Sequence, residues 1–213
     1  MTRAAFILSD DTPFAPCVGD ASLWQRLFGN EEAAPNPHEL PAYLSLARTG
    51  EPDALALLYA DYHAGIWRLC SRILRRDADA EDAVATTFVK AFAALPRFRG
   101  DASLKSWLYR IAVNESTTIL RRAARTQTAP DAGSDIVGDS GNGFGIAERI
   151  AVRSVLDAIK PDFRVVLVLR YWEELSYSDI ATVLGLPLPV VKMRLHRAKE
   201  AFRAAYEHAE EAD

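Results

Sequence analysis

The chain has 213 residues, of which 49% are hydrophobic and 25% are charged. This composition is typical of a folded globular protein and excludes a disordered or fibrous chain. No apolar run approaches the roughly 18 residues that a membrane-spanning helix needs, and the apolar stretch near the N-terminus is too short for a secretory signal. We therefore expect a cytoplasmic protein with no membrane insertion.

The cysteines and histidines give little support for metal or catalytic chemistry. Cys17 and Cys70 suit a reducing compartment without a disulfide framework, and neither lies at zinc-ligand spacing from another cysteine or a histidine. The histidines are scattered, and the sequence contains no phosphate-binding glycine loop, HExxH pair or nucleophile elbow. We expect no metal, no cofactor and no enzymatic activity.

The net charge of −4 is unevenly distributed along the chain. Residues 1–63 contain nine acidic and three basic side chains, a net charge of −6. Positive charge gathers in two later stretches, Arg97 to Arg122, with a net charge of +4, and Lys192 to Arg203. Basic stretches of this kind bind nucleic acid, so the acidic total does not exclude DNA as a partner.

Residues 1–40 contain four prolines and one short amphipathic piece, Leu23 to Phe28. We interpret them as a mobile N-terminal extension. Whether the amphipathic piece docks on the rest of the protein or is simply disordered stays open.

From residue 41 the apolar residues recur at threes and fours, which predicts helices. The first predicted domain spans 41–125. Its helices are 43–47, 53–75, 77–94 with an acidic first turn and Pro96 as a stop, and a fourth helix that starts at Asp101 or Ser103 and ends near 125.

This fourth helix is apolar on two sides. One stripe contains Leu104, Trp107, Leu108, Ile111 and Ile119, and the other contains Tyr109, Val113 and Leu120. A helix of this kind lies between neighbouring helices or faces a partner. Trp107 falls on an apolar stripe, so a core position is favoured over base stacking.

Residues 126–146, rich in glycine, serine and threonine, are predicted to form a flexible linker to a second domain, 147–207, with a short tail at 208–213. The expected helices are 147–159, 161–172, one that starts with a capping box at Ser176, and 189–207 after a break at Gly185. The fold class is therefore all-α, with two helical domains.

The last two helices, joined through Gly185, have the pattern of a helix-turn-helix. The second carries basic residues on its outward face, where they can contact base edges and phosphates in the major groove: Lys192, Arg194, His196, Arg197 and Lys199. The alternative is an ordinary helical hairpin with a solvated charged face. The absence of acidic residues among these positions favours DNA.

Two long stretches carry a resemblance to a known family. One runs from Asp79-Ala-Glu-Asp82 to Phe88 and resumes at Arg97-Phe-Arg-Gly through Asn114; the other runs from Leu167 to Gly185 and resumes at Val191 through Lys199. They resemble regions 2 and 4 of the extracytoplasmic-function (ECF) sigma factors, in the family's order and with a linker between them.

The resemblance implies a sigma factor that directs core RNA polymerase to specific promoters. The first domain would recognise the −10 element and open the strands, and the second would recognise the −35 element. The implied partners are core RNA polymerase, through the clamp helices of its largest subunit and the flap of the second largest, promoter DNA in duplex and melted form, and an anti-sigma factor.

The resemblance also implies site residues. The −10 candidates are Phe98, Arg99, Asp101, Ser103, Lys105, Tyr109, Arg110 and Asn114. The −35 candidates are Val190, Lys192, Met193, Arg194, His196 and Arg197. The core-polymerase candidates are Asp79, Glu81, Asp82, Thr86 and Phe88.

The sequence departs from the family pattern in both the region 2-like and the region 4-like stretch. Ala85-Thr86 stand where family members commonly have Gln-Glu, which removes polar contacts from the polymerase-facing helix. The recognition helix begins with Pro187, Leu188, Pro189 and Val190 in place of a hydroxyl cap, Gly and Thr, and Met193 replaces a small polar residue. We therefore expect −35 recognition to be unusual. The competing hypothesis is a helix-turn-helix regulator that binds duplex DNA without polymerase.

Overall fold

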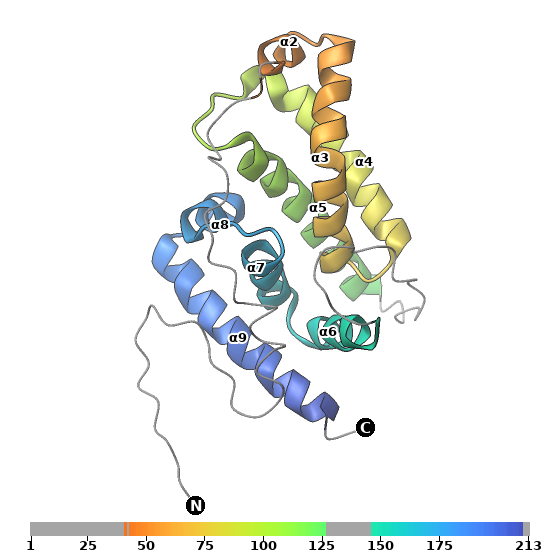
Figure 1. The fold of residues 1–213 in the computed structure, drawn as a ribbon, viewed down its shortest axis with the longest axis vertical. Coiled ribbons are helices and arrows are strands. Elements are labelled where there is room, and N and C mark those ends of the chain that lie inside the picture. Colours follow the sequence, from red (N-terminus) through yellow and green to blue (C-terminus); the bar gives the residue numbers. More distant parts are fainter. Residues whose placement is uncertain (1–40, 42, 127–145, 211–213) are drawn as a thin grey trace, which may run out of the picture. The chain divides into compact units, whose positions relative to one another are not determined.

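The structure is a computed structural model that describes residues 41, 43–126 and 146–210. These residues belong to one compact unit and contain helices but no strand, which confirms the all-α fold class (Figure 1). The elements are α2 (Leu44–Arg48), α3 (Pro52–Ile73), α4 (Asp77–Ala94), the 3-10 helix η1 (Leu95–Arg97), α5 (Leu104–Thr126), α6 (Ile146–Ala158), α7 (Pro161–Tyr171), α8 (Tyr177–Leu184) and α9 (Leu188–Glu210). The expected N-terminal extension, and the expected linker apart from its end residues 126 and 146, lie outside the described residues.

The first helical group, α2 to α5, has its core between α3, α4 and α5. Leu58, Ile66 and Leu69 of α3 are fully buried, as is Leu108 of α5, and Phe88 of α4 is 3% exposed. The helix bounds agree with the predicted ones within two residues. The regular spacing of apolar residues explains this agreement, because each helix buries the face that the spacing defines.

The chain between α4 and α5 shows one feature that the sequence did not reveal. After Ala94 the chain continues for one 3-10 turn, η1, and the Phe98 N–H donates to Leu95 O at 3.0 Å. Pro96 is compatible with this turn because it lies near the start, where no backbone N–H is needed. The N-cap of α5 is Ser103 and not Asp101, since Ser103 Oγ accepts from the Ser106 N–H at 3.1 Å.

Helix α5 lies between other helices on two sides, as its two apolar stripes predict. It packs against α3 and α4, and also against α7 and α8 (Figure 1). Leu104 and Leu108 of the first stripe and Tyr109 and Val113 of the second are all buried. Trp107 is half-buried and packs on Phe98, with ring centroids 5.1 Å apart, so the expected core position is met only in part.

The second helical group, α6 to α9, ends in the predicted helix-turn-helix. Ser176 caps α8, with its Oγ accepting from the Asp179 N–H at 3.1 Å. Gly185 ends α8 in the left-handed region, at φ 63°, and the Leu186 N–H returns to Ala181 O at 3.0 Å. A glycine is favoured there because a Cβ strains this backbone conformation. Helix α9 then runs to Glu210, three residues beyond the predicted end at 207.

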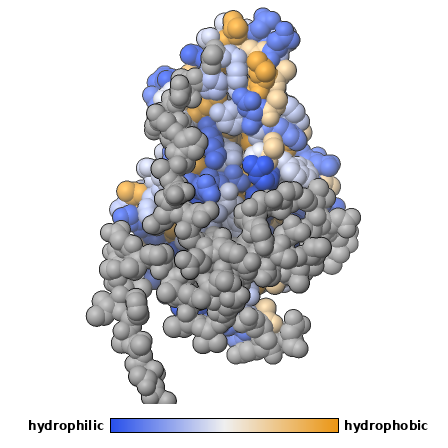
Figure 2. Space-filling view, viewed as in Figure 1, coloured by the Kyte–Doolittle hydropathy of each residue, from blue (hydrophilic) through white to orange (hydrophobic). Residues whose placement is uncertain are grey.

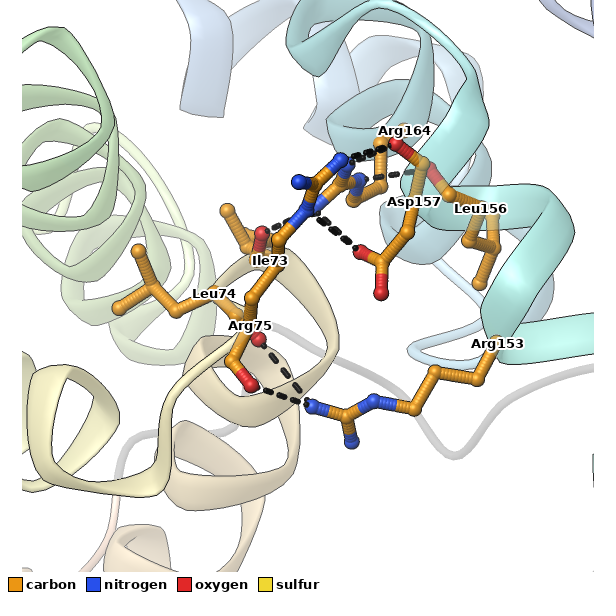
Figure 3. Close-up of polar contacts among 7 residues, drawn as sticks. All are labelled: Ile73, Leu74, Arg75, Arg153, Leu156, Asp157 and Arg164. Carbon is orange, nitrogen blue, oxygen red and sulfur yellow. Dashed lines mark hydrogen bonds and ion pairs between the residues drawn. The ribbon is translucent and has the colours of Figure 1, made fainter. Parts of the chain in front are cut away.

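A buried arginine joins the two helical groups (Figure 3). Arg164 of α7 is 2% exposed and donates through Nη1 to Ile73 O, at the end of α3, and through Nε to Leu156 O in α6, both at 2.8 Å. Its Nη1 also lies 3.0 Å from Asp157 Oδ1. Burial lowers the pKa of Arg164, and the Asp157 carboxylate opposes that shift. The guanidinium thus satisfies carbonyl groups that the ends of two helices leave without intrahelical partners.

We predict that Arg164→Leu lowers the free energy of unfolding by about 2 to 4 kcal/mol, because the carbonyl oxygens of Ile73 and Leu156 stay buried without a donor. Chemical denaturation followed by circular dichroism measures the loss. Arg153→Leu is the matched control. Arg153 donates to Leu74 O and Arg75 O from a half-exposed position, where water can replace it, so the expected loss is about 1 kcal/mol or less. Equal losses in the two variants would contradict a special role for the buried guanidinium.

Gly185→Ala is expected to destabilise the protein by about 1 to 2 kcal/mol, since alanine is strained at a positive φ. Gly185→Asn should lose less, because asparagine tolerates the left-handed region. Thermal unfolding of both variants provides the comparison. If alanine and asparagine cost the same, the backbone conformation is not the cause.

Candidate nucleic-acid and polymerase interfaces

The outward face of α9 carries most of the −35 candidates. Lys192, Met193, His196 and Arg197 are exposed, and Met193 is 47% exposed despite its apolar side chain. The inward face is buried, as predicted, through Val191, Leu195, Ala198 and Phe202. Packing of that apolar face fixes the rotation of α9 and therefore directs the basic side chains to solvent.

Two of the candidates on α9 have acidic neighbours. Arg194 is half-exposed and its Nη1 lies 3.4 Å from Asp162 Oδ2, at the start of α7. His196 Nε2 lies 3.4 Å from Glu200 Oε1, one turn further along α9. Both pairs are open to solvent and stabilise the fold little. The basic side chains can therefore exchange these partners for phosphate.

A hollow of about 570 Å³ lies beside the start of α9. Val190, a half-buried −35 candidate, lines it together with Met193, Arg194 and Arg197, and Arg121 of α5 and Lys160 lie on its wall. The lining includes four basic side chains and one acidic one, Asp162, so the positive charge of this surface extends beyond α9.

The −10 candidates divide into exposed and buried residues. Arg99, Asp101, Arg110 and Asn114 are exposed, and Lys105 is half-exposed. Arg99 and Asp101 lie in the loop before α5, whereas Arg110 and Asn114 lie one turn apart on α5 itself. These exposed side chains place polar and basic groups on the loop before α5 and on the solvent-facing side of α5.

Three −10 candidates are buried: Phe98 at 6% exposure, Ser103 at 2% and Tyr109 at 2%. Phe98 packs on Trp107, and Ser103 caps α5. These two side chains hold the loop and the helix start in place. The sequence did not indicate this burial, because an aromatic or a serine in a basic loop looks the same whether it packs inward or faces solvent.

Tyr109 is buried between α3 of its own helical group and the connection between α7 and α8. Its hydroxyl donates to Glu173 Oε2, in the connection between α7 and α8, at 2.6 Å. Burial raises the pKa of Tyr109, and the nearby Glu173 carboxylate raises it further. Lys105 Nζ donates to the backbone oxygen of Glu173 at 3.0 Å. Part of the −10 face of α5 therefore lies against the second helical group.

The core-polymerase candidates lie on α4. Glu81 and Asp82 are exposed, Asp79 and Thr86 are half-buried, and Phe88 is 3% exposed. Phe88 belongs to an aromatic cluster, with ring centroids 4.6 Å from Tyr59 and 6.3 Å from His63, both on α3.

A hollow of about 420 Å³ opens between α3 and α4 above this cluster. It is lined by Tyr59, His63, Trp67, Glu81, Val84 and Ala85. Ala85 is the residue that replaces a larger polar one in the family pattern. Val89, one turn along α4, is 69% exposed, the largest exposed fraction among the exposed large apolar side chains of the described residues.

Sequence reasoning missed the three aromatic residues of α3 in this hollow. Tyr59, His63 and Trp67 are four residues apart, so they lie on one face of a helix. That spacing is a signal that could have found them. A different apolar surface lies at the end of the molecule where α2 and the start of α3 lie, as Figure 2 shows; Leu46 and Leu57 there are 56% and 51% exposed.

No helix among the described residues is long and apolar enough to cross a membrane. Within the same residues no group of three or more histidine, cysteine or acidic side chains is placed to hold a metal ion.

Comparison with known proteins matches this chain to two family descriptions. The chain matches the family described as sigma-70 region 2 over residues 58–126 and the family described as sigma-70 region 4 over residues 149–202. The first match covers the α3–α5 part of the first helical group, and the second covers α6 to most of α9. The fold thus has the two all-α domains of the sigma-70 class.

Similar proteins show which sigma-70 subfamily the chain belongs to. The chain is 35% identical over 173 residues to the RNA polymerase sigma-H factor of Pseudomonas aeruginosa, covering 73% of this chain and 88% of that protein. It is 31% identical over 165 residues to the ECF RNA polymerase sigma-E factor of Escherichia coli K12, covering 71% and 86%. The chain belongs to the ECF sigma factors of the sigma-70 family.

A solved structure agrees with this family. CnrH in complex with the cytosolic domain of CnrY is similar with a TM-score of 0.58 and 27% identity, over 80% of this chain and 96% of that one. Sigma factors are regulatory and non-catalytic proteins of transcription initiation. The matches therefore favour the sigma factor over the competing regulator that acts without polymerase.

Proposed function

We propose that this sigma factor directs core RNA polymerase to promoters by reading the −35 element with α9 and by capturing the melted −10 element with α5 and the loop before it. The observation that carries the proposal is the division of α9 into a buried apolar face and an exposed basic face. A recognition helix needs this division, because it must be held rigidly by its domain while its outward side chains enter the major groove.

For the −35 element, Lys192, His196 and Arg197 are the proposed contacts to base edges and phosphates. Arg194 would join them by leaving its exposed partner Asp162. Val190 and Met193 cannot donate hydrogen bonds to bases, so they would contact thymine methyl groups or the sugar backbone. At the start of α9 the N–H groups of Val190 and Val191 both donate to Pro187 O, and Pro189 has no N–H, so few backbone donors remain there for a phosphate.

For the −10 element, Arg99, Arg110 and Lys105 are proposed to hold the strand backbone, with Asp101 accepting hydrogen bonds from unpaired bases and Asn114 donating to or accepting from them. Phe98 and Ser103 would act indirectly, because they pack and cap the start of α5. Tyr109 would contact DNA only after its present contacts are broken.

For the polymerase, the hollow between α3 and α4, together with the exposed Val89 one turn further along α4, is the proposed docking surface for the clamp helices of the largest subunit. Tyr59, Val89 and the Phe88 cluster beneath them offer apolar contact, and Glu81, Asp82 and the half-buried Asp79 and Thr86 form a polar rim. Apolar centres with polar rims are typical of protein interfaces. The second domain would contact the flap of the second-largest subunit.

We also propose that an anti-sigma factor holds this protein inactive. The similar protein CnrH was solved in complex with the cytosolic domain of another protein, CnrY, which supports a partner of this kind.

Promoter-dependent run-off transcription with core polymerase tests the whole proposal. Fragments from the region upstream of the protein's own gene serve as templates. A discrete transcript that requires this protein is the expected result. Absence of any such transcript on every template would overturn the proposed function.

Val89→Asp should lower the affinity for core polymerase about tenfold or more, since it places a charge in the apolar part of the docking surface. Binding is measured by fluorescence anisotropy of the labelled full chain titrated with core enzyme. Leu57→Asp is the control, because Leu57 of α3 is also more than half exposed but is not one of the residues of the proposed docking surface. A similar loss in both variants would argue against this surface.

Removal of one basic side chain that contacts phosphate should weaken DNA binding and make the affinity less sensitive to salt concentration. Arg197→Ala and Lys192→Ala are each expected to weaken binding to −35 duplex DNA and to lower the slope of log affinity against log salt by about one. Arg76→Ala removes the same charge from the exposed connection before α4 and should leave the slope unchanged. An equal change in slope for Arg76→Ala would show that only net charge matters.

A further inference from the structure

Glu173 is a buried acidic residue with contacts that the proposed DNA and polymerase surfaces do not require. It lies in the connection between α7 and α8 and is 4% exposed. Its Oε2 accepts from the Tyr109 hydroxyl at 2.6 Å, its Oε1 lies 3.4 Å from Arg72 Nη1, and its backbone oxygen accepts from Lys105 Nζ at 3.0 Å. Arg72 belongs to α3, whereas Lys105 and Tyr109 belong to α5. Every one of these contacts joins the second helical group to the first.

Neighbouring contacts extend the same interface. Ser106 Oγ donates to Asp179 Oδ1, at the start of α8, at 3.2 Å. On the other side of Tyr109, a Cβ placed on Gly65 of α3 would lie 2.8 Å from the Tyr109 hydroxyl oxygen. The hydroxyl therefore fits between α3 and Glu173 only because residue 65 has no side chain.

We infer that Glu173 holds this sigma factor in a closed state in which the second helical group covers Lys105 and Tyr109 on the −10 face of α5. One consequence of the closed state, that DNA can be captured at this face only after opening, rests on the proposed function. The closed state itself is a property of the free protein.

The chemistry of the interface suits a reversible contact. A buried carboxylate is stable only while its donors remain in place, and here each donor comes from the other helical group. On opening at the face of α5, Glu173, Arg72 and Lys105 can all be hydrated, so separation at this contact does not leave any of these three charges buried and unpaired. Polar interfaces between domains permit relative motion more readily than large apolar ones.

The closed state also lowers the apparent affinity for DNA. A ligand that binds only the open state has its affinity reduced by the fraction of molecules that are open. A substitution that removes one contact of Glu173 should raise that fraction by about tenfold, the effect expected for a hydrogen bond to a charged group.

The test compares Glu173→Gln with the matched control Glu174→Gln in the full chain. Glu174 is the next residue and is exposed, so it undergoes the same chemical change outside the interface. Acetylation by an N-hydroxysuccinimide ester, read by mass spectrometry, reports access to Lys105, with exposed Lys192 as the internal reference. We expect the Lys105 rate, relative to Lys192, to rise about tenfold in Glu173→Gln and to stay at the wild-type value in Glu174→Gln.

Small-angle X-ray scattering of the same proteins should show a larger radius of gyration for Glu173→Gln alone. An unchanged Lys105 rate in Glu173→Gln, or an equal rise in both variants, would overturn the inference. Because neither measurement contains polymerase or DNA, they can succeed even where run-off transcription fails, and the two proposals are thereby separated.

Gly65→Ala provides a second variant that leaves every charge in place. Alanine within a helix normally stabilises it relative to glycine. Here the added Cβ displaces the Tyr109 hydroxyl, so Lys105 should again become more reactive while circular dichroism shows intact helices. A Lys105 rate at the wild-type value in this folded variant would count against the role of the Tyr109–Glu173 contact.

Discussion

The arrangement of the two helical groups depends on buried charge. Arg164 and Glu173 are each nearly inaccessible to solvent, and each finds its partners across the boundary between the groups. A charge without water is costly unless hydrogen bonds and an opposite charge compensate for it. The boundary can therefore form only where the end of α3, the face of α5 and the α7–α8 connection are correctly placed together.

The two residues differ in what they contact. Arg164 binds mainly backbone carbonyl groups, which belong to helix ends and remain whatever the neighbouring side chains are. Glu173 binds the side chains of Tyr109 and Arg72, and these are the kind of groups that a competing ligand can recruit. The Arg164 contacts therefore suit a permanent connection between the helical groups, whereas the Glu173 contacts suit an interface that can open.

The candidate surfaces follow from how the helices pack. Helix α9 exposes its basic residues because Val191, Leu195 and Phe202 are held in the core. Helix α5 packs against other helices on two sides, and some of its polar residues, such as Lys105, contact the second helical group. The proposed DNA contacts of α9 and α5 are therefore subject to different conditions, because the basic face of α9 is exposed whereas Lys105 and Tyr109 of α5 contact the second helical group.

The sequence by itself determined the helices, their order and the outward face of α9, because apolar periodicity, the Ser176 cap and Gly185 act over a few neighbouring residues. It also identified the family, since long motifs preserve those local patterns. Only the tertiary structure decided that Phe98 and Ser103 are buried, that the Tyr109 hydroxyl pairs with Glu173, and that Arg164 and Glu173 are the charges at the boundary. Burial of a polar side chain depends on partners distant in the chain, such as Glu173 for Tyr109, and local spacing carries no information about them.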